Sequence, residues 1–260
     1  MGGAKIAVQT KCLAQPIKQA LHTAARLGCE GVQIDLRSEL PAAELSDTGR
    51  RQLRKMLDDL NLRMASVAFP TRRGYAAADE LERRLAATVE AMRAAAALGA
   101  RTALIALDPL PGRDSPQRAT LEEALSHLAA QAARLGVQLA GQCPAAEPRE
   151  VEALLQSLPE GCLGVDLSPA DQILHGRNPR DFIEALGPRI FHVFANDAVQ
   201  GAGGASGAVD VQLGRGSADV PELLGMLEEY GYRGWLTIER RHSPHPVEEV
   251  DDAVKFLRSL

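Results

Sequence analysis

Polar residues that can move protons lie within or at the end of three short apolar runs in the second half of the chain. Asp166 falls within LGVDL, His192 within IFHVFA, and Glu239 at the end of GWLTIE. Carboxylates and imidazoles take up and release protons beside a reacting carbon atom. These three residues are therefore the candidate catalytic residues.

Neutral and cationic side chains nearby are candidates for binding a substrate. Gln142, Ser168 and Asn196 each lie at or just beyond the end of a predicted strand and can donate or accept hydrogen bonds. Arg72 and Arg73 follow the third predicted strand, where a guanidinium could bind a phosphate or a carboxylate. The alternative for these two arginines is a solvated surface position.

Short β-rich runs alternate with longer helical runs along the whole chain. We predict strands over residues 5–9, 31–36, 63–68, 101–107, 137–141, 163–167, 190–195 and 234–239. We predict helices over 16–27, 48–60, 78–98, 120–135, 148–158, 221–230 and 246–260, a helical stretch before Pro179, and a flexible glycine-rich loop over 201–207. This alternation predicts a parallel sheet of about eight β/α units.

The length of the chain selects one architecture for these units. A (β/α)₈ TIM barrel has about 250 residues, and the chain has 260. We therefore predict an α/β protein with a single TIM barrel domain over residues 1–260. A doubly wound open sheet is the alternative, but TKCLAQP follows the first strand in place of G-x-G-x-x-G.

Composition excludes several classes of partner. The net charge is −5 and aromatic residues make up 3% of the chain, so neither a basic face nor a stacking surface for nucleic acid is expected. No apolar stretch approaches the roughly 18 residues that a membrane span needs. We expect a cytoplasmic protein without membrane or nucleic-acid partners, which could form a homodimer.

Longer segments resemble a known family. These are LGVDLSPADQILHGRNPRDFIEALGPRIFHVFANDA from Leu163, LGRGSADVPELLGMLEEYGYRGWLTIERR from Leu213, and the earlier FPTRRGY and LGARTALIAL. They are similar to the sugar phosphate isomerase/epimerase family, also called xylose-isomerase-like TIM barrels, over essentially the whole chain. The resemblance implies one divalent cation (Mn, Mg, Zn or Co), bound by a Glu, an Asp, a His and a Glu on the fifth to eighth strands.

The chain departs from this family pattern at most of the metal ligands. Gln142 stands where the first Glu is expected, Ser168 replaces the Asp, and Phe194 replaces the His. Asn196 replaces a family Lys, and Glu239 alone matches. An amide cannot act as a general base, and a single carboxylate with neutral donors rarely holds a divalent cation. We therefore predict no metal ligands and no cofactor.

Three functions compete on this basis. The first is a barrel with a degenerate metal site that binds a small polar, sugar-like ligand or a protein partner. The second is an active sugar or sugar-phosphate isomerase or epimerase with a relocated site at Asp166, His192 and Glu239. Asp166 and His192 could instead be an internal pair without function. A DNA repair endonuclease ranks last, because the chain is acidic.

Overall fold

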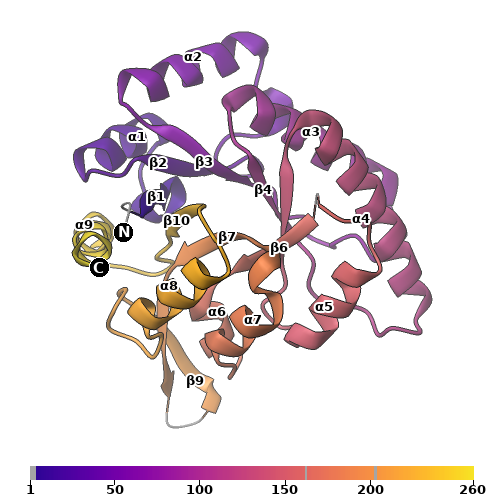
Figure 1. Ribbon diagram of the computed structural model, residues 1–260. Helices are drawn as coiled ribbons and strands as arrows, with labels where there is room; N and C mark the ends of the chain where they lie inside the picture. Colours follow the sequence, from indigo (N-terminus) through magenta and orange to yellow (C-terminus); the bar gives the residue numbers. More distant parts are fainter. Residues whose placement is uncertain (1–3, 162, 202–203) are drawn as a thin grey trace.

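Eight parallel strands close into a barrel, which confirms the predicted fold (Figure 1). The computed structural model describes residues 4–161, 163–201 and 204–260. Around the barrel the order is β1-β2-β3-β4-β5-β6-β7-β10, so each strand lies beside its neighbour in the sequence. The strands are β1 (Lys5–Gln9), β2 (Gly31–Asp35), β3 (Arg63–Ala68), β4 (Thr102–Ala106), β5 (Gln138–Gln142), β6 (Leu163–Leu167), β7 (Ile190–Ala195) and β10 (Trp235–Ile238).

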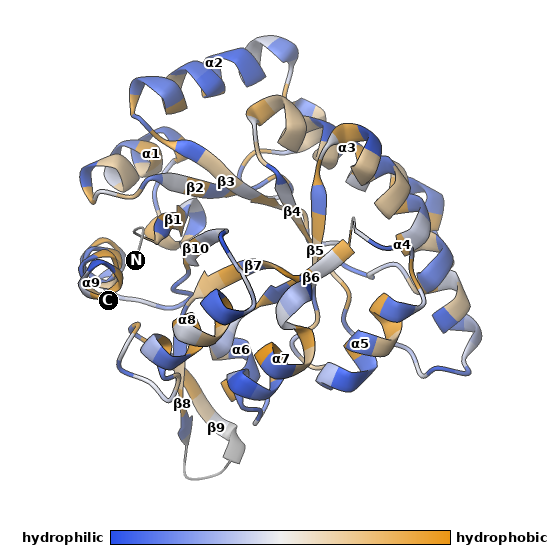
Figure 2. Ribbon diagram, in the orientation of Figure 1, coloured by the Kyte–Doolittle hydropathy of each residue, from blue (hydrophilic) through white to orange (hydrophobic). Residues whose placement is uncertain are grey.

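Helices surround the strands (Figure 1). They are α1 (Ile17–Arg26), α2 (Asp47–Asp59), α3 (Leu81–Leu98), α4 (Pro116–Leu135), α5 (Pro148–Gln156), α6 (Pro169–Leu174), α7 (Pro179–Leu186), α8 (Val220–Glu229) and α9 (Pro246–Ser259), with short 3-10 turns at Thr10–Leu13, Ala42–Glu44 and Gly187–Arg189. Figure 2 shows hydrophilic residues along much of α2, on the outside of the ring. Helix α4 begins four residues before its predicted start, because Ser115 caps it and Pro116 suits its first turn.

An aromatic ring fills part of the barrel interior. Phe194 of β7 is 1% exposed and packs with Ala68, Leu104 and Ala140, which come from β3, β4 and β5. The small side chains of Ala68 and Ala140 leave room for the ring, as close packing of an interior requires. The position of the expected histidine ligand is therefore occupied by an apolar group that belongs to the core.

The prediction of a flexible loop over 201–207 is wrong for the described residues. Strands β8 (Asp197–Gly201) and β9 (Gly204–Val211) pair as an antiparallel hairpin, and residues 202–203 lie outside the described part of the chain. The hairpin extends away from the barrel (Figure 1). Arg240 anchors it, because its guanidinium bonds Asp210 of β9 and also Glu249 of α9 at 2.6 Å. Backbone pairing and this anchor order a segment whose glycines indicate flexibility.

The glycine-rich segment LGRGS wraps around one carboxylate. Asp197 accepts backbone N–H bonds from Ala198 (2.9 Å), Gly214 (3.1 Å), Gly216 (2.8 Å) and Ala218 (3.0 Å). A Cβ at Gly216 would lie 2.1 Å from an oxygen of Asp197, so only glycine fits there. The segment is a structural turn, and these amides are already used by the chain itself.

Candidate functional site

Strand pairing brings Asp166 and His192 together. The two residues are direct partners in the register of β6 and β7. Asp166 Oδ1 lies 2.7 Å from His192 Nδ1, and both side chains are 2% exposed. The inward-facing alternation of each strand thus places both residues in the barrel interior as the sequence predicts.

Neutral side chains surround the Asp166–His192 pair. His192 Nε2 lies 3.2 Å from the amide nitrogen of Gln33 and 2.9 Å from Thr237 Oγ1. With the Gln33 amide as donor, Nε2 accepts and Nδ1 carries the hydrogen toward Asp166. Gln142 Nε2 donates to the other Asp166 oxygen at 3.3 Å. Gln142 therefore contacts the pair from the end of β5.

Burial affects the pKa of Asp166 in this pair. Burial raises the pKa of Asp166, and the hydrogen bond and charge of His192 oppose that rise. The Phe194 ring lies edge-on to the imidazole, with ring centroids 4.7 Å apart. Both polar groups are thus covered by the core, as expected of a paired internal contact.

Glu239 lies in a separate group of side chains at the ends of the strands. One oxygen, Oε2, accepts from Asn196 Nδ2 (2.9 Å) and from Arg241 Nη2 (3.0 Å) and Nε (3.2 Å). Asn196 Nδ2 also lies 3.0 Å from Ser168 Oγ. Asp171 of α6 completes this group, which we call the rim cluster: Ser168, Asp171, Asn196, Glu239 and Arg241.

Arg241 joins two carboxylates of the rim cluster. Its Nη1 and Nη2 atoms bond the two oxygens of Asp171 at 2.5 and 2.7 Å, in addition to the bonds to Glu239. Such a bidentate pair is among the stronger charged interactions in proteins. The sequence reasoning missed Arg241, which lies two residues after Glu239 and beyond the end of β10.

Two residues predicted to bind substrate also cap helix α6. Ser168 Oγ accepts the Asp171 N–H at 3.3 Å, and Asn196 Oδ1 accepts the Ala170 N–H at 3.0 Å. Pro169 has no N–H to offer. Ser168 and Asn196 thus satisfy the free amides of the first turn of α6.

The arginine pair lies outside this group. Arg72 and Arg73 are exposed in the loop after β3, and Arg73 pairs with Asp79 of the same loop. No hydrogen bond among the described residues joins either arginine to the rim cluster. The structure therefore brings together Glu239, Asn196 and Ser168, and separately Asp166, His192 and Gln142.

Neutral amides connect the two groups. Gln9 Nε2 lies 3.5 Å from Glu239 Oε1 and 3.0 Å from Gln33 Oε1, and Gln33 continues to His192. The sequence reasoning also missed Gln9 and Gln33, because a glutamine in a strand carries no distinctive pattern. Glu239 therefore reaches the buried pair through two side chains and without direct contact.

The donor groups do not fit a divalent cation. Within residues 4–161, 163–201 and 204–260, no group of three or more His, Cys, Asp and Glu side chains is arranged to hold a metal. The charge of Glu239 and Asp171 is offset by Arg241. Phe194 offers no donor. Arg241 is thus the positively charged group between these two carboxylates.

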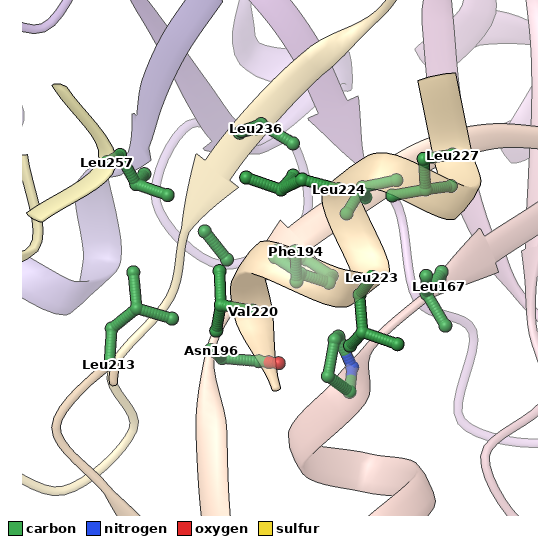
Figure 3. Close-up of a pocket in the computed structure, with 13 residues that line it drawn as sticks. Leu167, Phe194, Asn196, Leu213, Val220, Leu223, Leu224, Leu227, Leu236 and Leu257 are labelled. Carbon is green, nitrogen blue, oxygen red and sulfur yellow. The ribbon is translucent and has the colours of Figure 1, made fainter. Parts of the chain in front are cut away.

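A small apolar cavity lies between α8 and strands β7 and β10, and Asn196 of the rim cluster is among the residues that line it. Figure 3 shows leucines of α8 such as Leu223 and Leu227 around it, together with Leu236 of β10. Its volume is about 20 Å³, enough for one water, and an apolar lining of this kind stays dry. It is a packing gap of the core, lined mainly by leucines and other apolar residues.

The titration of Glu239 leads to a pH prediction. Burial raises the pKa of Glu239 above its ordinary value of 4.5, and the charge of Arg241 opposes that rise. A raised carboxyl pKa gives stability that is complete below the unfolded pKa and is lost as pH rises through the folded pKa. We therefore expect the unfolding free energy of wild type, relative to Glu239→Gln, to fall as pH rises from about 4.5.

Urea unfolding of both proteins over a pH series measures this difference. Glu248→Gln is the matched control, because the Glu248 side chain is 81% exposed. A wild-type advantage that grows with pH would contradict the assigned direction.

Comparison with known proteins identifies the family of the chain. A family profile described as xylose isomerase-like TIM barrel matches residues 21–260. The chain belongs to this family. No match was found among curated proteins. No helix in the described part of the chain is long and apolar enough to cross a bilayer.

Solved structures share the fold at low sequence identity. A xylose isomerase domain protein from Planctomyces limnophilus has a TM-score of 0.83 and 20% identity, over 92% of this chain and 91% of its own. A xylose isomerase-like TIM barrel protein from Mycobacterium smegmatis, in complex with magnesium, has 0.78 and 17%, over 99% and 97%. The 3-keto-D-glucoside 4-epimerase from E. coli has 0.76 and 15%, over 99% and 100%.

Proposed function

We propose that this barrel binds a small polar, sugar-like molecule at the rim cluster and does so without a divalent cation. One observation carries the proposal: Arg241 bonds both Glu239 and Asp171. In a metal site the carboxylates need a cation to offset their charge. Here Arg241 supplies the positive charge that offsets the two carboxylates.

Partly exposed polar groups at the same end of the barrel supply the contacts for such a ligand. Gln9 and Gln142 are half-buried at the ends of β1 and β5, and the Glu239 side chain, just beyond β10, is 9% exposed. Amides and carboxylates donate to and accept from hydroxyl groups. A polyhydroxylated molecule can replace water at these groups. A structural relative is a 3-keto-D-glucoside 4-epimerase, which makes sugars the first compounds to screen.

An active isomerase or epimerase is the second candidate function. The carboxyl group of Glu239 just beyond the end of β10 favours it, because a carboxyl group can act as a general acid or base. Amides do not exchange protons as acids or bases near neutral pH, so Glu239 alone could serve a bound substrate. If Glu239→Gln left the turnover of every accepted sugar unchanged, this second function would fail.

The metal content of the purified protein tests the main proposal. We expect no stoichiometric Mn, Mg, Zn or Co by elemental mass spectrometry on tag-free protein, and no saturable rise in Tm with Mn²⁺. An ion that binds the folded state raises Tm by mass action. In the variant Arg241→Ala the carboxylates of Glu239 and Asp171 lose the guanidinium that offsets their charge. We therefore expect the Tm of this variant to rise with Mn²⁺.

Arg73→Ala is the control, because Arg73 pairs with Asp79 at the surface. Stoichiometric metal in the wild-type protein would contradict the proposal. If Mn²⁺ does not raise the Tm of Arg241→Ala, the guanidinium does not take the place of a metal ion.

A further inference from the structure

A group of cations lies at the end of the barrel opposite the rim cluster, where all the parallel strands begin. Five of the eight barrel strands have a lysine or an arginine at their first residue or within the two residues before it: Lys5 (β1), Arg63 (β3), Arg101 (β4), Arg189 (β7) and Arg233 (β10). At the same positions of the other three strands, the described residues include one carboxylate, Glu30 before β2. We call the five cations the basic surface.

The basic surface has no ion pair in the described part of the chain. Lys5, Arg63, Arg101 and Arg233 are exposed and Arg189 is half-buried, and none of them has a carboxylate oxygen within 4.0 Å in residues 4–161, 163–201 and 204–260. Lys5, Arg189 and Arg233 donate to backbone carbonyl oxygens at 3.1, 3.3 and 2.9 Å. Because no carboxylate offsets it, the charge of these side chains can attract an anionic group.

An aromatic ring lies beside these cations. Trp235 is half-buried and is the direct partner of Lys5 in the register of β10 and β1. Lys5 Nζ lies 6.0 Å from the centre of the ring. A Cβ at Gly31 would lie 2.9 Å from the ring, so glycine leaves room for it at the start of β2, next to Arg63. Tryptophan and arginine are residue types that contribute much of the binding energy of protein interfaces.

The helix ends around the basic surface carry both signs of charge. Arginines lie in the last turns of α1, α4 and α9, whereas α2 and α8 end in paired carboxylic residues: Arg26, Arg134 and Arg258, and Asp58, Asp59, Glu228 and Glu229. A long polyanion such as nucleic acid would meet these outer carboxylates, and the net charge of −5 also repels it. A short acidic segment can contact the central cations without reaching the outer carboxylates.

We propose that the basic surface binds a short acidic segment of a partner protein. The cations at the strand starts supply the complementary charge, which steers association and fixes the position of the segment. The Trp235 ring supplies apolar contact area among these charges. The surface lies at the opposite end of the strands from Glu239, so this proposal does not depend on the ligand proposed for the rim cluster.

The fluorescence of Trp235 reports on this surface, because the chain has no other tryptophan. The probe is an acetylated and amidated hexaglutamate peptide, titrated into the full chain with calorimetry as a second readout. We expect a saturable change in emission, with an affinity that weakens as ionic strength rises, because salt screens exposed charges. A hexalysine peptide should cause no saturable change.

Charge reversal locates the surface that binds the peptide. In Arg63→Glu and in Arg233→Glu we expect the affinity for hexaglutamate to fall at least about tenfold, because a repulsive charge replaces an attractive one. Both arginines are exposed, and the second variant keeps the test valid if the first does not fold. Lys18→Glu makes the same change at an exposed residue in the first turn of α1, at the other end of the barrel, and should bind the peptide as wild type does.

Four outcomes would overturn the proposal. The first is the absence of saturable hexaglutamate binding at low ionic strength, and the second is an equal loss of affinity in Lys18→Glu. Tighter binding of a thymidine hexanucleotide than of hexaglutamate would assign the surface to nucleic acid. Concentration-dependent self-association that Arg63→Glu and Arg233→Glu both abolish would assign it to a second copy of this chain.

Discussion

Phe194→Ala is expected to lower the free energy of unfolding by about 3–5 kcal/mol, as truncation of a buried aromatic ring does. The ring is 1% exposed and packs with residues of β3, β4 and β5. Its edge contact with His192 would also be lost. The substitution leaves a cavity at the centre of the closed barrel. Each barrel strand is hydrogen-bonded to a neighbour on both sides, so the strands have little freedom to collapse into this cavity. Urea denaturation measures the loss.

Two further variants control this result. Val209→Ala removes apolar atoms from a side chain that is 54% exposed, and we expect a change within about 0.5 kcal/mol. Phe194→His restores the residue type that the family has there. Because Arg241 still neutralises Glu239, we expect Phe194→His to bind no Mn²⁺ by itself. A loss below about 1 kcal/mol in Phe194→Ala would show that the ring does not support the barrel interior.

The architecture could be predicted because its signals are local. Each strand lies beside the next strand of the barrel in the sequence, apart from the β8–β9 insertion, so the order of elements sets the topology. Strand alternation also placed Asp166 and His192 on inward faces, and the register of β6 and β7 makes them partners. The hairpin was missed because its glycines suggest a loop, whereas its order comes from cross-strand pairing and from Arg240.

The candidate site was harder to predict, because its contacts are distant in sequence. Arg241 and Asp171 are 70 residues apart, and only the closed barrel brings them together. Sequence reasoning identified Glu239 and the substituted ligand positions. It could not show which cation replaces the metal, because two consecutive arginines after a strand are typical of a solvated surface. In the sequence, the one indication of a nearby cation is Glu239, a carboxylate whose expected metal partner is missing.

Asp166→Ala is expected to lower the free energy of unfolding by about 1–3 kcal/mol, because it leaves the buried imidazole N–H of His192 without a hydrogen-bond partner. The variant leaves His192 without its 2.7 Å partner in a site where both side chains are 2% exposed. It also frees the amide of Gln142. Asp59→Ala is the matched control, because Asp59 pairs with Lys55 at the surface and is 61% exposed. Such an exposed pair contributes about 0.3–0.5 kcal/mol.

A double-mutant cycle with His192→Ala separates a structural role from a catalytic one. If the pair is an internal contact, the two single variants lose more stability together than the double variant does, because each leaves a buried polar group unpaired. Ligand affinity at the rim cluster should then change little, since Glu239 reaches the pair only through Gln9 and Gln33. A fully folded Asp166→Ala protein that has lost turnover of a sugar would instead make the buried pair part of a relocated active site.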